Sequence, residues 1–168
     1  MPDDIGGVPT HPLTVHVPVV MVPLALVAVI AYFFGRSWRR PLVWVAGVLS
    51  GGGAFGAVLA ASSGESLRER VTESQALADH ADMGETARLL AFLFFLIVVA
   101  LVVYEEIRLR RTVDERPPSR IANLAAHRLA FPVIAVLLLI SGGAAVVSLA
   151  VAGHQGAKVT WQKIGPSP

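Results

Sequence analysis

Histidines are the residues of this sequence best suited to chemistry, and each lies near the end of a long apolar segment. Imidazole nitrogens bind zinc, copper and iron, and two imidazoles on facing helices can also hold the iron of haem b from both sides. There is no His-x-x-x-His pair and no Cys-x-x-Cys-His motif, so the choice between a metal ion and haem stays open. A third interpretation, in which each ring sits among lipid headgroups, also stays open. The five histidines are His11, His16, His80, His127 and His154.

The composition speaks against several other kinds of chemistry. The chain has no cysteine, which rules out disulfides and thiolate metal sites. No hydrolase triad, phosphate-binding loop or nucleotide fingerprint is recognisable, so the sequence leaves open whether the protein is an enzyme. No carboxylate or lysine lies in the middle of an apolar segment, which argues against a proton-coupled transporter.

The elements that must position the histidines are four apolar segments without a charged residue. The chain is 54% hydrophobic and only 15% charged, below the roughly 25% of soluble domains. A helix needs about 20 apolar residues to cross the hydrocarbon core of a bilayer. The third segment has only 16, but it gains a turn at each end if Arg88 snorkels and Glu105 reaches the interface. The segments are Leu13–Phe34, Pro41–Ala61, Leu89–Tyr104 and Leu129–Ala152.

This pattern predicts one membrane domain, an all-α bundle of four transmembrane helices with up-down topology, at about 13–34, 41–61, 85–107 and 129–152. One side of it, made of the connections 35–40 and 108–128 with their helix ends, holds nine basic and four acidic residues. The other side, made of both termini and the connection 62–84, holds five basic and eight acidic residues. Because Lys and Arg in short connections stay in the cytoplasm, both termini are expected outside. Topology therefore explains the basic residues without a nucleic-acid partner.

Two helices carry further signals. The stretch Thr72–Gln75 offers N-cap residues and no proline follows before Arg88, so helix three is expected to extend above the outer surface. Helix two repeats glycine at a spacing of four, which favours close packing near the centre of the bundle. Its packing glycines are Gly47, Gly51, Gly52 and Gly56. The intramembrane serines Ser50, Ser141 and Ser148 are expected to bond to backbone carbonyls one turn back.

The predicted topology gathers most of the histidines at the outer face. His16 falls about one turn inside the membrane, and His80 and His154 fall just outside it, at a height similar to that of Glu65. We therefore expect His16, His80 and His154 to converge as ligands of a metal ion or haem. Glu65 would be a further ligand, or would hold one imidazole by its other nitrogen.

Two histidines stand apart from this set. His11 precedes His16 by five residues, about 140° around a helix, so the two share one direction only if Pro12 breaks the helix. His127 falls beside Arg128 at the cytoplasmic face, where an interfacial role suffices.

Four short motifs resemble the DUF2231 family of bacterial membrane proteins. The opening His11–Pro18 is similar to the family's His-Pro-x-x-Val-His-Phe-Pro signature, with Val17 in place of the phenylalanine. The closing segment departs further, with Ala157, Trp161 and Lys163 where the family has glycine, tyrosine and often histidine. The other matches are Ser63-Gly64-Glu65, His80-x-x-x-Gly84 and Gly153-His154-x-Gly156. The resemblance implies a four-helix membrane protein, and its motif positions include His11, His16, Glu65, His80 and His154.

The interpretation favoured by the sequence is an outer-face site for haem b or for zinc, copper or iron that serves electron transfer or metal handling, in a multi-pass protein of the bacterial plasma membrane. Its partners would be the lipid bilayer and a redox partner protein. The alternative is a non-catalytic accessory subunit, whose glycine-rich helix packs against a larger membrane complex.

Overall fold

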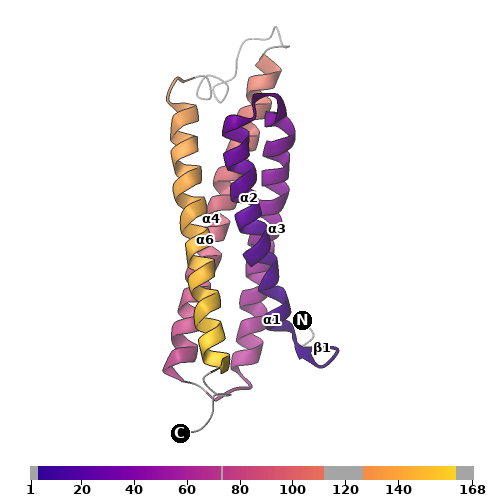
Figure 1. Ribbon diagram of the computed structural model, residues 1–168, viewed down its shortest axis with the longest axis vertical. Helices are drawn as coiled ribbons and strands as arrows, with labels where there is room; N and C mark the ends of the chain where they lie inside the picture. Colours follow the sequence, from indigo (N-terminus) through magenta and orange to yellow (C-terminus); the bar gives the residue numbers. More distant parts are fainter. Residues whose placement is uncertain (1–3, 73, 112–126, 162–168) are drawn as a thin grey trace.

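A computed structural model describes residues 4–72, 74–111 and 127–161 and consists of four long helices that run up and down (Figure 1). Each of the four is long and apolar enough to cross a membrane, α2 together with the short α1 before it. This confirms the predicted all-α membrane bundle. The helices are α1 (Thr10–Thr14), α2 (His16–Phe34), α3 (Arg39–Arg68), α4 (Gln75–Arg111) and α6 (Ala130–Trp161).

Short elements complete the described chain. Strands β1 (Asp4–Ile5) and β2 (Val8–Pro9) pair antiparallel before α1. Gly6 and Gly7 join them with φ of 62° and 82°, the left-handed conformation that a tight hairpin turn requires. A 3₁₀ turn, η1 (Arg36–Trp38), links α2 to α3.

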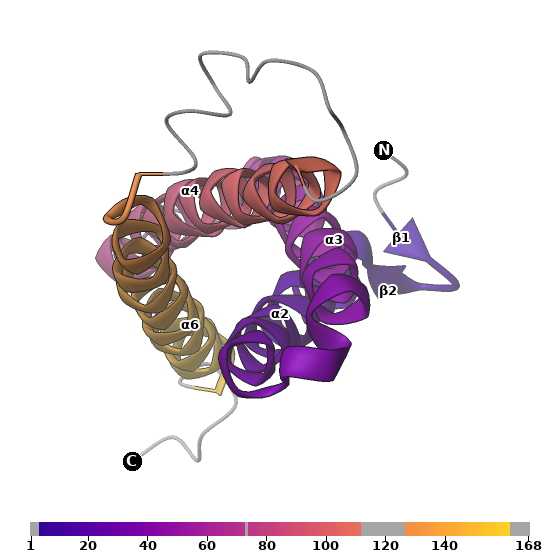
Figure 2. The same cartoon turned by 90° about the horizontal axis from the view of Figure 1, so that it is seen from above.

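The four long helices form a ring in which each has two neighbours (Figure 2). α3 lies between α2 and α4, and α6 closes the ring between α4 and α2. Fully buried apolar side chains from all four helices fill the interior, among them Val22, Val29, Val43, Phe94 and Leu138. The sequential order of neighbours follows from short connections between antiparallel helices.

The α3–α4 corner is tighter than the predicted connection 62–84, because both helices continue into it. Only residues 69–74 join them. The predicted cap is present: the Ser74 hydroxyl accepts a hydrogen bond from the Leu77 amide at 3.3 Å. With 37 residues, α4 is about 55 Å long, well beyond the roughly 30 Å of a hydrocarbon core. It is therefore long enough to extend beyond the bilayer, in keeping with the predicted extension of helix three.

Glycines of α3 let the neighbouring helices approach its backbone. A Cβ atom at Gly56 would lie 2.5 Å from Cγ1 of Val17 and 3.0 Å from Cδ of Pro18 on α2. On the side of α4, a Cβ atom at Gly51 would lie 3.2 Å from Cε2 of Phe95. Helix packing in lipid depends on such close approach, since apolar side chains gain nothing by leaving lipid for a neighbour.

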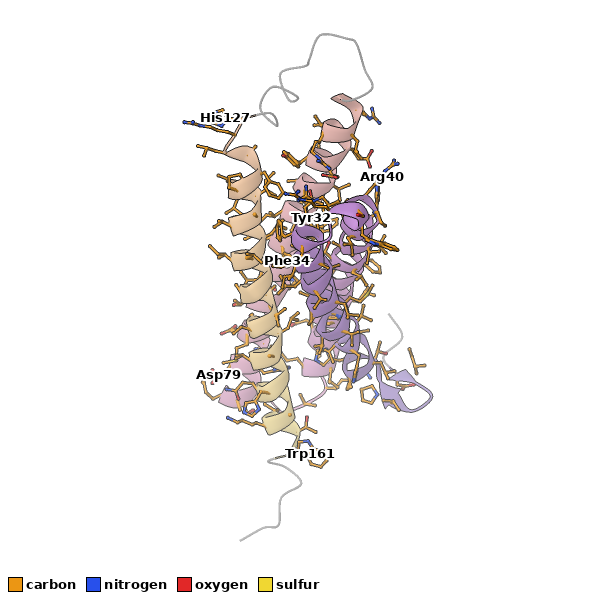
Figure 3. The ribbon with its side chains drawn as sticks, turned by 45° about the horizontal axis from the view of Figure 1, so that its top comes forward. Tyr32, Phe34, Arg40, Asp79, His127 and Trp161 are labelled. Carbon is orange, nitrogen blue, oxygen red and sulfur yellow. The ribbon has the colours of Figure 1, made fainter. Side chains whose placement is uncertain are left out.

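The two ends of the bundle differ in chemistry and are named here for use below. The histidine end holds α1, the start of α4 and the end of α6, with His11, His80 and His154. The arginine end holds the other tips of the helices, with Arg39, Arg40 and Arg108. Figure 3 shows Asp79 and Trp161 at the histidine end and Arg40 and His127 at the arginine end.

Candidate functional site

Two imidazoles lie next to each other, at a steep angle, inside the histidine end. His11 comes from α1 and His80 from the second turn of α4, and their ring centroids lie 6.2 Å apart with the planes at 77°. Both side chains are half-buried. The structure thus brings together the first and third of the sequence motifs, which are separated by more than sixty residues.

Hydrogen bonds fix the orientation of His11. Its Nδ1 lies 2.9 Å from the carbonyl oxygen of Ala60 on α3. A carbonyl only accepts, so Nδ1 carries the proton and the lone pair of Nε2 is left available. The hydroxyls of Thr14 and Ser63, 2.8 Å apart, tie α1 to α3 beside this bond. Gly64 gives the ring its room, because a Cβ atom there would lie 3.1 Å from Cε1 and Nδ1 of His11.

The backbone of α6 surrounds His80 closely. The Nδ1 atom of His80 is buried and has no hydrogen-bond partner in the described part of the chain. The backbone of Ala152 on α6 lies within hydrogen-bonding reach of the same ring. A Cβ atom at Gly156 would lie 2.9 Å from Cε1 and 3.3 Å from Nε2 of His80, so the backbone of α6 packs directly against the imidazole. A buried polar atom without a partner is uncommon and marks a place where a ligand could be bound.

The other predicted site residues lie at the same end but do not join this pair. His16 is exposed, and its Nδ1 lies 2.6 Å from the carbonyl oxygen of Pro12. His154 and Glu65 are exposed as well. Within residues 4–72, 74–111 and 127–161, no three His, Cys, Asp or Glu side chains come close enough to hold a metal ion together. The expected convergence of His16, His80 and His154 is therefore not seen.

The break in the first helix explains this difference. α1 ends at Thr14 and α2 begins at His16, so the two histidines of the opening motif belong to different helices. His11 turns inward to α3, and His16 turns outward against the carbonyl of Pro12. His127 lies at the arginine end, where its Nδ1 accepts a hydrogen bond from the Leu129 amide at 3.3 Å.

Two neighbouring imidazoles can share one metal ion. Metal–imidazole bonds are about 2.0 Å long and the ring centroid lies roughly 1 Å behind the nitrogen, so two rings on one ion have centroids about 5–6.5 Å apart. The observed 6.2 Å falls in this range. A porphyrin on the same pair would extend several ångströms to each side of the iron. Because α6 packs against the Nε2 edge of His80 at Gly156, the residues present fit a bare ion better than haem b.

The arginine end contains a polar cluster that the sequence analysis missed. Glu105, which was expected to lie near the membrane interface, has a side chain that is only 1% exposed. The Tyr32 hydroxyl donates to Oε2 of Glu105 at 2.9 Å, and the Arg108 guanidinium donates to both carboxylate oxygens at 2.6 and 3.0 Å. The guanidinium of Arg39 stacks over the rings of Tyr32 and Phe131, with centroids at 5.4 and 5.9 Å.

This cluster is best explained as a structural anchor. A buried carboxylate is tolerated when it is paired and hydrogen-bonded, and Glu105 meets both conditions. One signal in the sequence was Tyr32, a tyrosine near the end of a long apolar segment, since a buried hydroxyl needs a partner. The spacing of Glu105 and Arg108 on one helix face was a second.

Comparison with known proteins gives one match. The family model DUF2231, described as a predicted membrane protein, matches residues 7–165. Curated proteins and solved structures give no match. The matched region contains all four helices and both histidines of the histidine pair.

Proposed function

Since the chain belongs to the DUF2231 family of predicted membrane proteins, we propose that it binds one transition-metal ion between His11 and His80. The observation that carries this proposal is the histidine pair itself, with a centroid distance that suits a shared ion. His11 has the arrangement expected of a ligand, because its Nδ1 proton is held by a carbonyl and its other nitrogen is available. His80 has a buried nitrogen that lacks any other partner in the described chain.

The number of protein ligands favours metal handling over a permanent redox centre. Two imidazoles leave coordination positions for water or for an exchanging donor, whereas structural sites fill all four. Imidazole suits zinc, copper and iron, and the order of affinities among divalent ions places copper highest. The ion, when bound, would supply an exchangeable positive charge. The carbonyl of Ala60 orients the ring of His11. Gly64 and Gly156 have no side chains, and this leaves space for the rings of His11 and His80.

The proposal places this site at the outer face of a bacterial plasma membrane. The charge asymmetry of the connections supports that orientation, since the arginine end would face the cytoplasm. His16, His154 and Glu65 are exposed at the same end and would meet an incoming ion before it reaches the pair. A reporter fused after Pro168 should then be active outside, and one inserted at Pro117 only in the cytoplasm.

Metal titration of the protein in nanodiscs tests the pair. The protein should bind one equivalent of Cu²⁺, with an electron paramagnetic resonance spectrum that shows two nitrogen ligands. His11→Ala and His80→Ala should each weaken binding by at least tenfold, since each removes one of two protein ligands. His16→Ala, His154→Ala and His127→Ala are the matched controls and should bind as the wild type does.

Other outcomes would redirect the assignment. A Soret band in the protein as isolated would establish haem in place of a bare ion. Loss of binding in His16→Ala and His154→Ala but not in His11→Ala would restore the ligand set expected from the sequence. A protein without any metal, recovered only with other membrane proteins, would favour the accessory subunit.

A further inference from the structure

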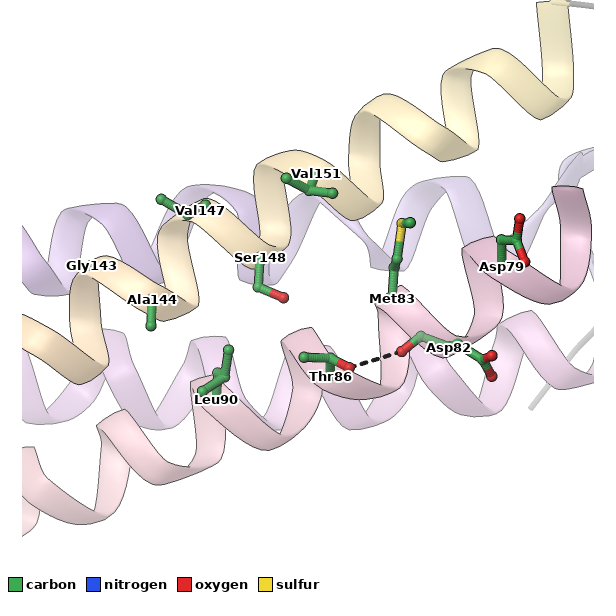
Figure 4. Close-up of a pocket in the computed structure, with 10 residues that line it drawn as sticks. All are labelled: Asp79, Asp82, Met83, Thr86, Leu90, Gly143, Ala144, Val147, Ser148 and Val151. Atoms are coloured by element: carbon green, nitrogen blue, oxygen red, sulfur yellow. Dashed lines mark hydrogen bonds between the residues drawn. The ribbon is translucent and has the colours of Figure 1, made fainter.

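A groove on the outside of the bundle, between α4 and α6, is separate from the histidine pair. It has a volume of about 750 Å³. Figure 4 shows its length, from Asp79 and Asp82 at the histidine end to Leu90 and Gly143 toward the middle of the bundle. Residues 79–90 of α4 span about 16 Å, the length of roughly twelve methylene groups in an extended chain.

The two ends of the groove have opposite character. At its mouth are the carboxylates of Asp79 and Asp82, and no basic side chain lines the groove. Asp79 accepts one hydrogen bond, from Nε2 of Gln75 at 2.8 Å, whereas the Asp82 carboxylate has no partner in the described chain. Deeper in, the walls are the apolar side chains of Leu90 and Val147 and the bare backbone of Gly143.

A polar group midway along the groove lacks a partner. Ser148 was expected to bond to a carbonyl one turn back, as Ser141 does with Leu137 at 2.6 Å. Within residues 4–72, 74–111 and 127–161, however, no hydrogen bond is formed by the Ser148 hydroxyl, which lines the groove opposite Thr86. A hydroxyl at this depth is most stable with a hydrogen-bond partner, and the groove leaves that place to an occupant.

We propose that this groove binds a single-chain amphiphile with a cationic ammonium head, which enters sideways from the outer leaflet. The head would lie between the carboxylates of Asp79 and Asp82, and the chain would lie over Gly143. A polar link below the head would accept from Ser148. The charge of the mouth selects this occupant, because an anionic head would be repelled and a phosphate group would find no basic side chain in the groove.

Binding of spin-labelled amphiphiles of equal chain length tests the proposal. In nanodiscs of neutral lipid, an alkyltrimethylammonium probe should show a motionally restricted fraction, and alkyl sulfate and alkyl maltoside probes should not. Asp79→Asn with Asp82→Asn should reduce the restricted fraction severalfold. Glu85→Gln is the matched control, because Glu85 lies on the same helix outside the groove and pairs with Arg88.

A substitution that fills the groove tests whether the probe occupies the groove itself, apart from its attraction to the two carboxylates. A Cβ atom at Gly143 would meet nothing within 4 Å, so the side chain of Gly143→Leu starts in open space at the wall of the groove. It should abolish restriction of the cationic probe and leave thermal stability unchanged. Gly153→Leu adds the same bulk to α6 at a position equally free of neighbours but outside the groove, and should bind normally.

Three results would overturn the proposal. The first is equal restriction of cationic, neutral and anionic probes. The second is unchanged binding in both the Asp79/Asp82 double variant and Gly143→Leu. The third is rapid disulfide cross-linking of Val147→Cys between two copies in native membranes, which is clean to read because the chain has no cysteine of its own. That result would show that a second copy covers the groove.

Discussion

Glu105 at the arginine end and His80 at the histidine end differ in how their buried polar atoms are satisfied. At the arginine end, Glu105 is almost wholly buried, yet both its oxygens are occupied by Tyr32 and Arg108. At the histidine end, His80 is only half-buried, yet its Nδ1 has no partner in the described chain. A satisfied polar cluster stabilises one packing, whereas an unsatisfied one lowers stability unless something binds there. Arg39 at the arginine end also has a buried Nε without a hydrogen-bond partner in the described chain, so the contrast concerns Glu105 and His80 and not each end as a whole. It assigns Glu105 to stabilising the fold, and under the metal-binding proposal it leaves the His80 nitrogen for a ligand.

The largest effect is expected from Glu105→Ala. It would leave the Tyr32 hydroxyl buried without an acceptor and free the Arg108 guanidinium, so unfolding in detergent should become easier by about 3 kcal/mol. Glu106→Ala is the matched control. Glu106 pairs with Arg40 at 3.5 Å, accepts a hydrogen bond from Nε1 of Trp44 at 3.2 Å and is 25% exposed, and its loss should have an effect of about 1 kcal/mol. Equal losses in the two variants would contradict the assignment of Glu105 as an anchor.

Gly56→Ala should destabilise the bundle by about 2 kcal/mol, because the new methyl group would overlap the rigid side chains of Val17 and Pro18. The same change at Gly84, where a Cβ atom would meet nothing within 4 Å, should stabilise α4 by about 0.5–1 kcal/mol. Thermal unfolding of the two variants side by side measures the difference. Unchanged stability in Gly56→Ala would mean that α2 and α3 can move apart at this contact at little cost.

Gly156→Ala should affect binding more than stability. Its methyl group would push the His80 ring away from α6, and we expect metal affinity to fall about tenfold while the unfolding midpoint changes little. Gly153→Ala, at a position without neighbours within 4 Å, should keep wild-type affinity. Calorimetric titration of both variants with Cu²⁺ gives the answer. Unchanged affinity in Gly156→Ala would show that the position of His80 does not matter.

The smallest effect is expected from His80→Leu in the metal-free protein. Replacing a buried, unpartnered nitrogen by an apolar group should leave stability unchanged or raise it by less than about 1 kcal/mol. Tyr32→Phe at the arginine end should instead lower stability by about 1 kcal/mol, because it removes the hydrogen bond to Glu105. A large loss in His80→Leu would make the imidazole a structural residue and remove the contrast with Glu105.

Local sequence signals predicted much of the fold. The four spans follow from segments without charge, and the early start of α4 follows from the cap at Ser74. These features depend on residues close together in the chain, so spacing and composition suffice to find them.

The histidine pair, the Glu105 cluster and the groove depend on contacts between helices, which the spacing of residues along the sequence does not reveal. The heights of the histidines along their helices placed His16, His80 and His154 together, but the break after Thr14 turned His11 inward and His16 outward. Glu105 borders an apolar segment, and only its contact with Tyr32, 73 residues earlier, explains why it is buried. Ser148 faces a groove that exists only once α4 and α6 are packed.

The uninterrupted course of α4 has a mechanical consequence. One helix carries both His80 and Glu105, 25 residues or about 38 Å apart, with no proline and a single glycine along its whole length. α2, by contrast, has Pro23 in its interior. Sharp kinks in helices occur mostly at proline or at glycine and serine pairs, and α4 has neither between His80 and Glu105. We expect a displacement of α4 at His80 to change the packing at Glu105, because the two side chains belong to one continuous helix.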